Sequence, residues 1–338
     1  MEDMPPDHLD RIDCFVIGGS AGAFGAVRRV LSRLPRDFPA SILVCIHQSP
    51  FAAGQGAALL RKQTGLNVQP ARDGAPLDHG TVYVAVPDTH LVIGSDHIHL
   101  RRGAHENNFR PAIDPLFRSA AVFRGPRAVA IVLSGLMDDG AAGARAVNRT
   151  GGKVLVQDPE TADYREMPDA VIAARAGAEV LPLDDIASRM IALAGAPCAP
   201  MGEVPWQIGL ELKITTMEAA SMKNEERLGT LTPFNCPHCN GVLWEIEDGP
   251  MTRYRCHTGH AYTATSLSAS QEEALDFGLF NALRASRGRA ELIRRIAGKE
   301  EDERHRERLE NRAKKFEEDA EHLEALILQR TTGRDAQD

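Results

Sequence analysis

The chain has 338 residues, of which 43% are hydrophobic and 25% are charged, and its formal net charge is -8 at pH 7. This length predicts two domains and excludes a disulfide-stapled miniprotein, and the composition excludes wholesale disorder. The negative charge provides no overall positive field for nucleic acid or an anionic membrane, and the lack of a readable signal peptide or long apolar run predicts a cytoplasmic protein without membrane insertion.

The first part of the chain alternates short apolar runs with helical stretches. Strands are predicted at 14–18, 42–46, 81–86, 128–133 and 153–156, and helices at 22–34, 55–63, 114–122, 141–148 and 184–193. The segment 82–100 alternates in polarity, which favours a hairpin. Apolar strands separated by helices indicate an α/β fold with a doubly wound, mostly parallel sheet in three αβα layers.

A stretch rich in alanine, proline and glycine after Leu193 ends this pattern. We therefore expect a first domain at 11–195 and a linker at 196–228 with a short helix at 211–228. A zinc-ribbon-like module at 229–265 and a helical, coiled-coil-type region at 266–332 are expected to follow. The helical region has two apolar stripes separated by a charged stretch at 299–308, which favours either a helical hairpin or one long helix.

A serine stands where the first predicted strand turns into a helix. Gly18-Gly19-Ser20-Ala21-Gly22 fits the pattern G-x-S-x-G, in which small neighbours let the backbone turn sharply and expose the serine hydroxyl. Backbone amides near this serine and at 135–137 could stabilise an oxyanion. The alternative is that the serine only caps the helix. A dinucleotide site is not indicated, because no acidic residue follows the second strand.

Two further polar groups follow other predicted strands. His47 follows the second strand, which places it at the same carboxyl edge as Ser20 and makes it a candidate general base. Asp138 and Asp139 follow the strand at 128–133, where one of them could orient the imidazole or cap a helix. The residue types of a catalytic triad are thus present in the order Ser, His, Asp, which differs from the common α/β-hydrolase order.

These segments carry a family resemblance. GGSAGAFGAVRRVLSRLP, ILVCIHQSP, DGAPLDHGTVYVAVPDTHL, RPAIDPLFRSAA and VLSGLMDDGAAGARAV follow one another within residues 11–195. They resemble the successive motifs of the CheB-type chemotaxis protein-glutamate methylesterases. The resemblance implies a triad of Ser20, His47 and Asp139, with Asp138 where the family often has asparagine.

The resemblance also implies a function. It implies a serine hydrolase that removes γ-methyl esters from glutamates on chemoreceptor helices, releases methanol and needs no catalytic cofactor. The alternatives are a receptor glutamine deamidase with the same triad, or a regulatory interaction protein of a two-component-type signalling system. Methylated chemoreceptors are the expected partner, and the C-terminal helices could serve intramolecular packing, a signalling partner or self-association.

The sequence departs from well-known family members at several points. It begins close to the first predicted strand, so we expect no receiver domain and no regulation of that kind in cis. Ala21 stands where those members have threonine, and Phe109 precedes Arg110-Pro111 where several have histidine.

Three of the six cysteines gather with histidines in the second half. The spacing C-x2-C-x16-C-x3-H suits a structural, tetrahedral Zn²⁺ site, although reduced buried cysteines are the alternative. The predicted ligands are Cys236, Cys239, Cys256 and His260, with His238 and His257 as alternates outside the site. Basic and acidic residues balance across 227–265, so we expect no nucleic-acid contact. Because the triad includes no zinc ligand, we expect residues 11–195 to fold and act without this module.

Overall fold

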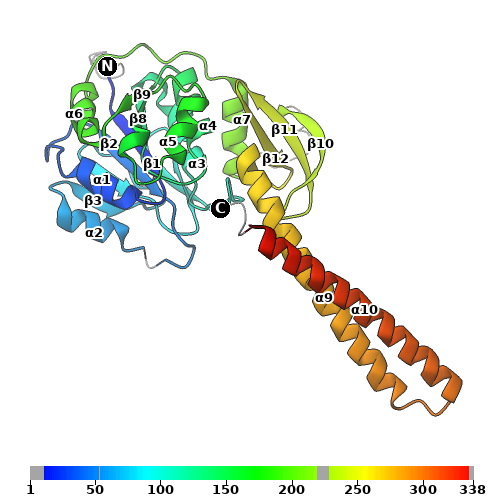
Figure 1. The fold of residues 1–338 in the computed structure, drawn as a ribbon. Helices are drawn as coiled ribbons and strands as arrows, with labels where there is room; N and C mark the ends of the chain where they lie inside the picture. The colour runs from blue at the N-terminus through cyan, green and yellow to red at the C-terminus, as the bar shows by residue number, and fades with distance from the viewer. Residues whose placement is uncertain (1–10, 53, 219–227, 335–338) are drawn as a thin grey trace. The chain divides into compact units, whose positions relative to one another are not determined.

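The computed structural model describes residues 11–52, 54–218 and 228–334 (Figure 1). The strands are β1 (Cys14–Gly19), β2 (Ser41–Ile46), β3 (Asn67–Pro70), β4 (Thr81–Val84), β5 (His90–Ile93), β6 (Ile98–Arg101), β7 (Ala128–Val132), β8 (Lys153–Gln157), β9 (Glu179–Leu181), β10 (Thr230–Asn235), β11 (Val242–Asp248), β12 (Met251–Cys256) and β13 (Ala261–Thr263). The α-helices are α1 (Ala23–Leu31), α2 (Gly56–Gln63), α3 (Ile113–Phe123), α4 (Ala141–Arg149), α5 (Glu166–Ala173), α6 (Leu183–Leu193), α7 (Trp206–Thr215), α9 (Ala264–Ala297) and α10 (Glu303–Arg334). A boundary between two compact units falls between Leu267 and Ser268.

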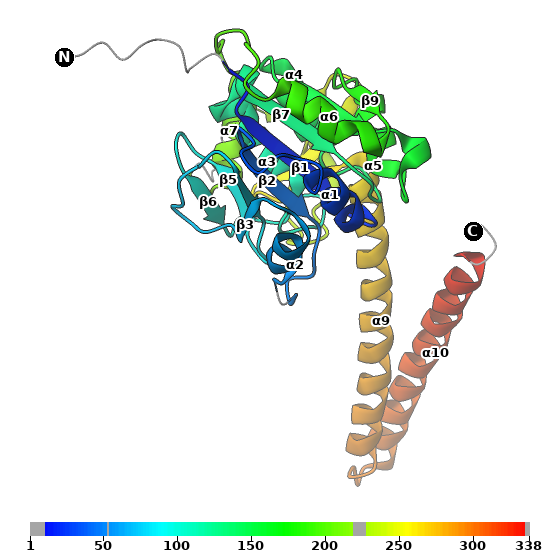
Figure 2. The same cartoon turned by 90° about the vertical axis from the view of Figure 1, so that its left-hand side faces the viewer.

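The first unit contains a seven-stranded sheet in the order β3-β4-β2-β1-β7-β8-β9, with every pair parallel. The chain places β2 on one side of β1 and later returns to place β7 on the other side (Figure 2). Gly19 pairs with Ile46 and Gly18 pairs with Val132, so β1, β2 and β7 end at nearly the same level. In open α/β sheets, ligands bind at the carboxyl edge beside such a reversal of strand order.

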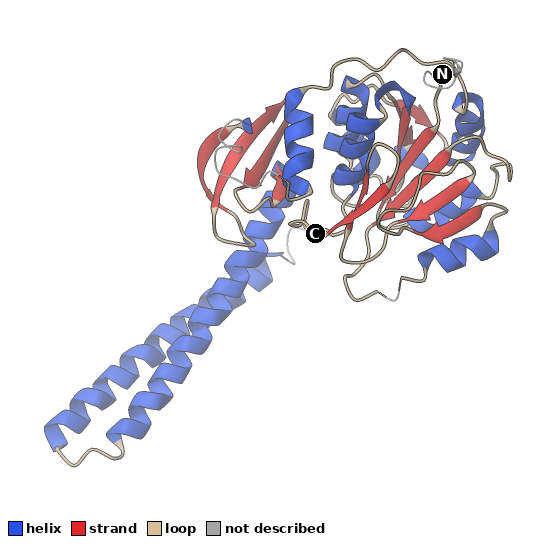
Figure 3. Cartoon of the chain, turned by 180° about the vertical axis from the view of Figure 1, so that it is seen from behind, coloured by secondary structure: helices blue, strands red, loops and turns tan. Residues whose placement is uncertain are grey.

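Both faces of the parallel sheet carry an apolar core. Phe15 and Ile17 belong to the core that α1, α2 and α6 cover, whereas Cys14 and Val16 belong to the core beneath α3, α4, α5 and the β5–β6 hairpin. Figure 3 shows the helices on the two sides of the strands. Alternate residues thus face opposite cores, as expected of strands buried on both sides. The prediction of a doubly wound, three-layer α/β fold is confirmed.

The observed elements differ from the predicted ones in detail. The strand predicted at 81–86 ends at Val84, and the helix predicted at 22–34 covers only Ala23–Leu31. The sequence does not predict β3 or β9, which are too short to show a clear periodicity, or α5, which has Pro168 in its first turn.

The helix predicted at 211–228 falls partly outside the described residues. Its first part coincides with the end of α7 (Trp206–Thr215), and residues 219–227 lie outside the described part of the chain. The hairpin predicted within 82–100 is present as β5 and β6.

A second, antiparallel sheet has the strand order β10-β11-β12-β13. Its apolar cluster is small and is formed by Cys236, Leu243, Cys256, Tyr262 and Leu267. So few buried side chains provide little hydrophobic stabilisation. This sheet therefore depends on its contacts with the rest of the first unit.

In the second unit, α9 and α10 form an antiparallel hairpin (Figure 3). Their buried apolar residues include Leu283, Ala290, Ile293, Ala313 and Ala320. Arg287 pairs with Glu324 and Arg294 pairs with Glu317 across the two helices. Of the two arrangements that the sequence left open, the hairpin is therefore the one present. No helix in the described ranges combines the length and apolar character that crossing a membrane requires.

A buried cluster of charges joins the second sheet to α3 and α7. Arg255 in β12 lies 3.2 Å from the Glu106 carboxylate and 3.3 Å from that of Glu211 in α7. Arg118 in α3 also pairs with Glu106, at 3.2 Å, and Arg253 pairs with Glu211, at 2.6 Å. Burial alone raises the pKa of Glu106, but the charges of Arg118 and Arg255 outweigh it and lower this pKa to about 2.

We expect Glu106→Gln to lower the free energy of unfolding by about 3–5 kcal/mol, because it removes one of the two carboxylates that neutralise the buried Arg118 and Arg255. Urea denaturation of the full chain at pH 7 measures this change. The matched control is Glu160→Gln, at a carboxylate whose side chain is 76% exposed, and it should have little effect. Equal stability of Glu106→Gln and the wild type would contradict this account of the cluster.

The same cluster predicts a dependence of stability on pH. The pKa of Glu106 is lowered from 4.5 to about 2, so its ionised form contributes stability that is complete above about pH 4.5. This contribution is lost as the pH falls through about 2. The wild type should therefore lose stability more steeply than Glu106→Gln between these pH values, and parallel curves would contradict the assignment.

Candidate active site

Ser20 lies in a sharp turn between β1 and α1. Its amide donates a hydrogen bond to the Ser134 carbonyl at 3.0 Å, which ties the turn to the residue pair that follows β7. A Cβ on Gly19 would lie 2.4 Å from the Cβ of Ala23, and Gly22 has a φ of 75°, so glycine is required at both positions. Gly22 is the N-cap of α1 and no side chain caps it, so the alternative that Ser20 is a helix cap is wrong.

His47 directly follows β2 and lies between the other two predicted triad residues. Its Nδ1 is 3.1 Å from Ser20 Oγ, and its Nε2 is 2.7 Å from Asp139 Oδ2. In the common Ser-His-Asp template, it is Nε2 that faces the serine. The ring of Phe109 stacks on the imidazole at a centroid distance of 3.6 Å and an angle of 11°. Contacts at both nitrogens and on one face therefore fix the orientation of the imidazole.

Asp139 caps a helix, but not the helix that follows it. Its Oδ2 accepts a hydrogen bond from the Ile113 amide at 2.6 Å, and its Oδ1 accepts one from the Asp114 amide at 3.1 Å, both at the start of α3. The Asp114 carboxylate in turn accepts from the amides of Gly140 and Gly143 at the start of α4. The carboxylate that precedes α4 therefore caps α3, and the carboxylate in the first turn of α3 caps α4.

The two carboxylates differ in their ionisation. Burial by itself raises the pKa of Asp139, but the hydrogen bond and charge of His47 and the Ile113 amide outweigh burial and lower it. Burial and the neighbouring Asp139 charge raise the pKa of Asp114. Asp139 is therefore the carboxylate that remains ionised. A charged acceptor at Nε2 favours the tautomer with a proton there, which leaves Nδ1 as the base facing Ser20.

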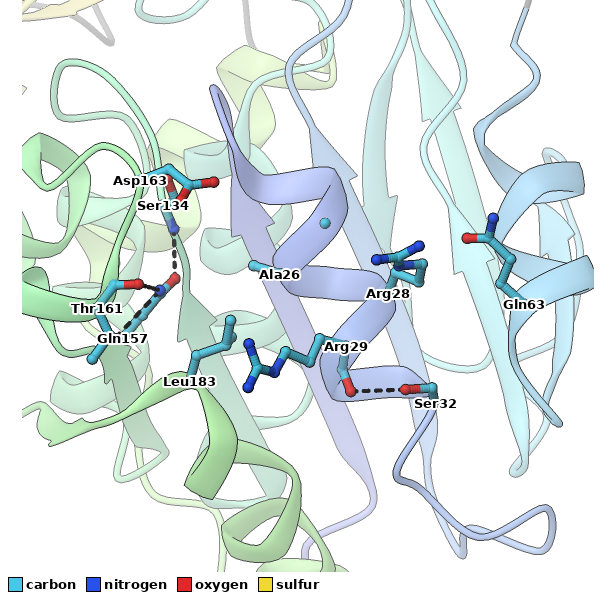
Figure 4. Close-up of a pocket in the computed structure, with 11 residues that line it drawn as sticks. Ala26, Arg28, Arg29, Ser32, Gln63, Ser134, Gln157, Thr161, Asp163 and Leu183 are labelled. Carbon is cyan, nitrogen blue, oxygen red and sulfur yellow. Dashed lines mark hydrogen bonds between the residues drawn. The ribbon is translucent and has the colours of Figure 1, made fainter.

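Ser20 and His47 line a cleft of ≈ 450 Å³, together with His105, Asn108 and Phe109. A larger hollow of ≈ 630 Å³ lies beside α1 and contains none of the triad residues (Figure 4). In that hollow, Gln157 bonds to the Ser134 amide and to Thr161, so these polar groups satisfy one another. The smaller cleft is thus the one that offers a nucleophile and a base.

Several amides near the serine are already occupied. The amides of Ser20 and Gly135 donate to the carbonyls of Ser134 and Tyr164, and the Met137 amide donates to the Glu166 carboxylate. These three amides cannot also bind an oxyanion in this conformation. Within the segments that the sequence indicated, the candidates are therefore the amides of the residues that follow Ser20 and Gly135 in the chain.

The four predicted metal ligands are brought together in the second sheet. These ligands are Cys236, Cys239, Cys256 and His260, and their ligand atoms all lie within 4.8 Å of one another. The two sulfurs of Cys239 and Cys256 are 3.7 Å apart. Tetrahedral zinc with bonds of about 2.3 Å to sulfur would separate two sulfurs by about 3.8 Å, so this spacing fits the ion.

The alternates His238 and His257 are not members of this group. His238 Nδ1 lies 2.7 Å from the hydroxyl of Tyr262, which occupies one of its ring nitrogens. The four-residue set chosen from the spacing is therefore the one whose ligand atoms converge.

Two residues against the triad were missed as site residues by the sequence reasoning. Asn107 Nδ2 donates to Asp139 Oδ1 and to Asp114 Oδ2, both at 2.9 Å. Asp114 gave a partial signal, since it starts a predicted helix, but nothing local shows that it caps α4. Asn107 lies in a segment without periodicity, so only the three-dimensional structure reveals its contacts.

The chain is similar to several known proteins. Residues 15–190 match the family model described as CheB methylesterase. A protein-glutamate methylesterase/protein-glutamine glutaminase 2 of Methanosarcina mazei is 33% identical over 183 residues, which cover 52% of this chain and 50% of that protein. A protein-glutamate methylesterase/protein-glutamine glutaminase 4 of Myxococcus xanthus is 38% identical over 175 residues, again 52% of this chain and 50% of the relative. The chain thus spans about half the length of the curated relatives it matches.

A solved structure is similar over the same part of the chain. The crystal structure of the CheB methylesterase catalytic domain of Thermotoga maritima has a TM-score of 0.52 and 33% sequence identity, and the match covers 54% of this chain and 98% of that domain. The family model itself covers just over half of this sequence. The chain belongs to the CheB methylesterase family.

Proposed function

We propose that this protein hydrolyses γ-methyl esters of glutamate side chains on methylated chemoreceptors and releases methanol. The observation that carries the proposal is the line of contacts from Ser20 through His47 to Asp139, at 3.1 and 2.7 Å, in a cleft at the carboxyl edge of the sheet. The names of the relatives, which are protein-glutamate methylesterases, support this substrate class.

In the proposed reaction, Ser20 Oγ attacks the ester carbonyl carbon while its proton passes to His47 Nδ1. The bond from carbon to the methoxy oxygen then breaks, and His47 gives its proton to that oxygen, so methanol leaves and a glutamyl acyl-enzyme remains. Water next gives a proton to His47 and attacks the acyl carbon. The bond from that carbon to Ser20 Oγ then breaks, His47 returns the proton to Oγ, and glutamate leaves. Asp139 stays ionised and stabilises the imidazolium, and the amides of Ala21 and Leu136 bind the oxyanion.

The same groups support deamidation of receptor glutamines as a second reaction. The acyl-enzyme is identical, and ammonia replaces methanol as the leaving group. The names of the relatives join the two activities, which favours glutaminase activity as the second candidate. A purely regulatory role would not require a nucleophile, a base and a carboxylate to lie in mutual contact.

We further propose that Cys236, Cys239, Cys256 and His260 hold a structural Zn²⁺ in a cytoplasmic protein. Four protein ligands would close the coordination sphere, so the ion would stabilise the second sheet and would not itself contact the ester or the triad.

The apolar residues exposed on the C-terminal helices, among them Phe277, Phe280 and Leu328, support a contact with a signalling partner or with a second copy of the chain.

The triad assignment predicts large losses of activity. Ser20→Ala and His47→Ala should each lower the rate of methanol release by up to about a million-fold, and Asp139→Asn somewhat less, because triad members act as a unit. Release of methanol from methyl-labelled receptor membranes measures the effect. Asp138→Asn is the matched control, since this neighbouring carboxylate bonds to Thr263 instead of His47 and should matter far less. An ordinary rate in Ser20→Ala would refute the mechanism.

The metal assignment predicts about one zinc per chain in the full-length protein, measured by elemental analysis. The double variant Cys236→Ser with Cys239→Ser should contain none. Cys198→Ser is the control, because this half-buried cysteine lies outside the four-residue group, and it should retain the metal. If the full-length protein contained no zinc and bound no added Zn²⁺, the proposal of a structural metal site would be wrong.

A further inference from the structure

A buried asparagine lies between the triad carboxylate and the second sheet. Asn107 is 4% exposed, and its Nδ2 donates to Asp139 Oδ1 at 2.9 Å. Its Oδ1 accepts from the Thr263 amide at 3.1 Å and from the Ser266 hydroxyl at 3.2 Å. The donor end of one side chain therefore contacts the active site, while its acceptor end contacts β13 and the start of α9.

The backbone of this segment is also tied to β13. The Asn107 amide donates to the Ala261 carbonyl at 2.8 Å, and the Ala261 amide donates to the His105 carbonyl at 3.3 Å. Thr263 Oγ1 additionally donates to Asp138, the residue beside Asp139, at 2.8 Å. Movement of β13 would thus move both Asn107 and the turn that carries the triad aspartate.

β13 is in turn connected to the Cys/His group. It begins at the residue after His260 and pairs with β12, which ends at Cys256. The hydroxyl of Tyr262 in β13 lies 3.3 Å from Cys236 Sγ. Ligands of the proposed metal therefore lie at one end of β13 and on its neighbouring strand, and their convergence would fix its position.

The buried charge cluster also connects the second sheet to the segment that carries Asn107. Glu106, beside Asn107, pairs with Arg255, which directly precedes Cys256 in β12. The short segment that carries Glu106 and Asn107 also carries Phe109, which stacks on His47. Contacts from the second sheet thus reach the imidazole as well as the carboxylate.

We infer that Asn107 is a positioning residue for the triad, and that Zn²⁺ binding at Cys236, Cys239, Cys256 and His260 controls the turnover number of the esterase through it. The inference rests on the proposed function. Without the ion, the small core of the second sheet does not hold β13, Asn107 loses its acceptor-side partners, and Asp139 and His47 lose their alignment. This inference predicts the opposite of the sequence-based expectation that residues 11–195 act without the module.

The first test replaces Asn107 in the full-length, zinc-loaded protein. Asn107 has a φ of 50°, which glycine adopts without strain, so Asn107→Gly removes the side chain without straining the backbone. We expect kcat for a small ester, p-nitrophenyl acetate, to fall about 10- to 100-fold with little change in KM, as for other residues that orient a reactive group. Arg175→Gly, at an exposed residue with a φ of 51°, is the matched control and should retain kcat.

The second test combines this variant with removal of the metal. Chelation should lower kcat in the wild type by a similar factor, and added Zn²⁺ should restore it. It should cause little further loss in Asn107→Gly, because both changes break the same connection. The rate at which a fluorophosphonate labels Ser20 gives a readout that needs no ester turnover. Losses that multiply, or a zinc-free wild type with full kcat, would overturn the inference.

A third variant covers the case in which the zinc-free chain unfolds. Ser266→Ala in the zinc-loaded protein removes one donor to Asn107 Oδ1 and should lower kcat several-fold in the wild type but not in the Asn107→Gly background. An equal loss in both backgrounds would contradict the proposed route. If the proposed function were wrong, the result would differ, because Ser20→Ala would then retain activity. If Ser20→Ala is inactive and Asn107→Gly retains full kcat, only the present inference falls.

Discussion

The buried carboxylate of Asp139 is the group on which the geometry of the candidate active site depends. Removing a charge from water is costly unless donors replace its hydration. Here the donors are the N-terminal amides of α3, the carboxamide of Asn107 and the imidazole of His47. The same hydrogen bonds that keep Asp139 ionised also fix its position, so ionisation and geometry have a common origin. Helix α3, the Asn107 turn and the imidazole must all be in place for either to hold.

Parts of this arrangement could be predicted from the sequence, because they follow from local patterns. Apolar strands followed by Ser20 and by His47 place both residues at the carboxyl edge of a parallel sheet, and the register of β1 with β2 brings them level. The spacing of the four Cys/His residues likewise requires only a short-range knuckle and a neighbouring strand. In each case the reactive residues lie at or near the end of an element that the sequence pattern predicts.

The remaining contacts could not be predicted, because they join segments far apart in the chain. Asp114 reads as the first turn of a helix, yet its carboxylate caps α4. Glu211 and Arg118 lie in segments predicted as helices, and nothing in those segments indicates that both are buried in one charge cluster. These buried charges are compensated by opposite charges from distant parts of the chain, and one sequence does not show that pairing. The segment predicted as a linker therefore contains a residue, Glu211, that is buried against the first predicted domain.

The turn that carries Asn107 contacts both the carboxyl edge of the parallel sheet and the second sheet. Asn107 and Asn108 have φ values of 50° and 72°, a left-handed conformation that is unfavourable for residues other than glycine, although asparagine tolerates it best. Two such residues in succession persist only where surrounding contacts determine them. For Asn107, those contacts come from Asp139 on one side and from Ala261 and Thr263 on the other. The left-handed conformation of Asn107 is therefore held by contacts that come from both sheets.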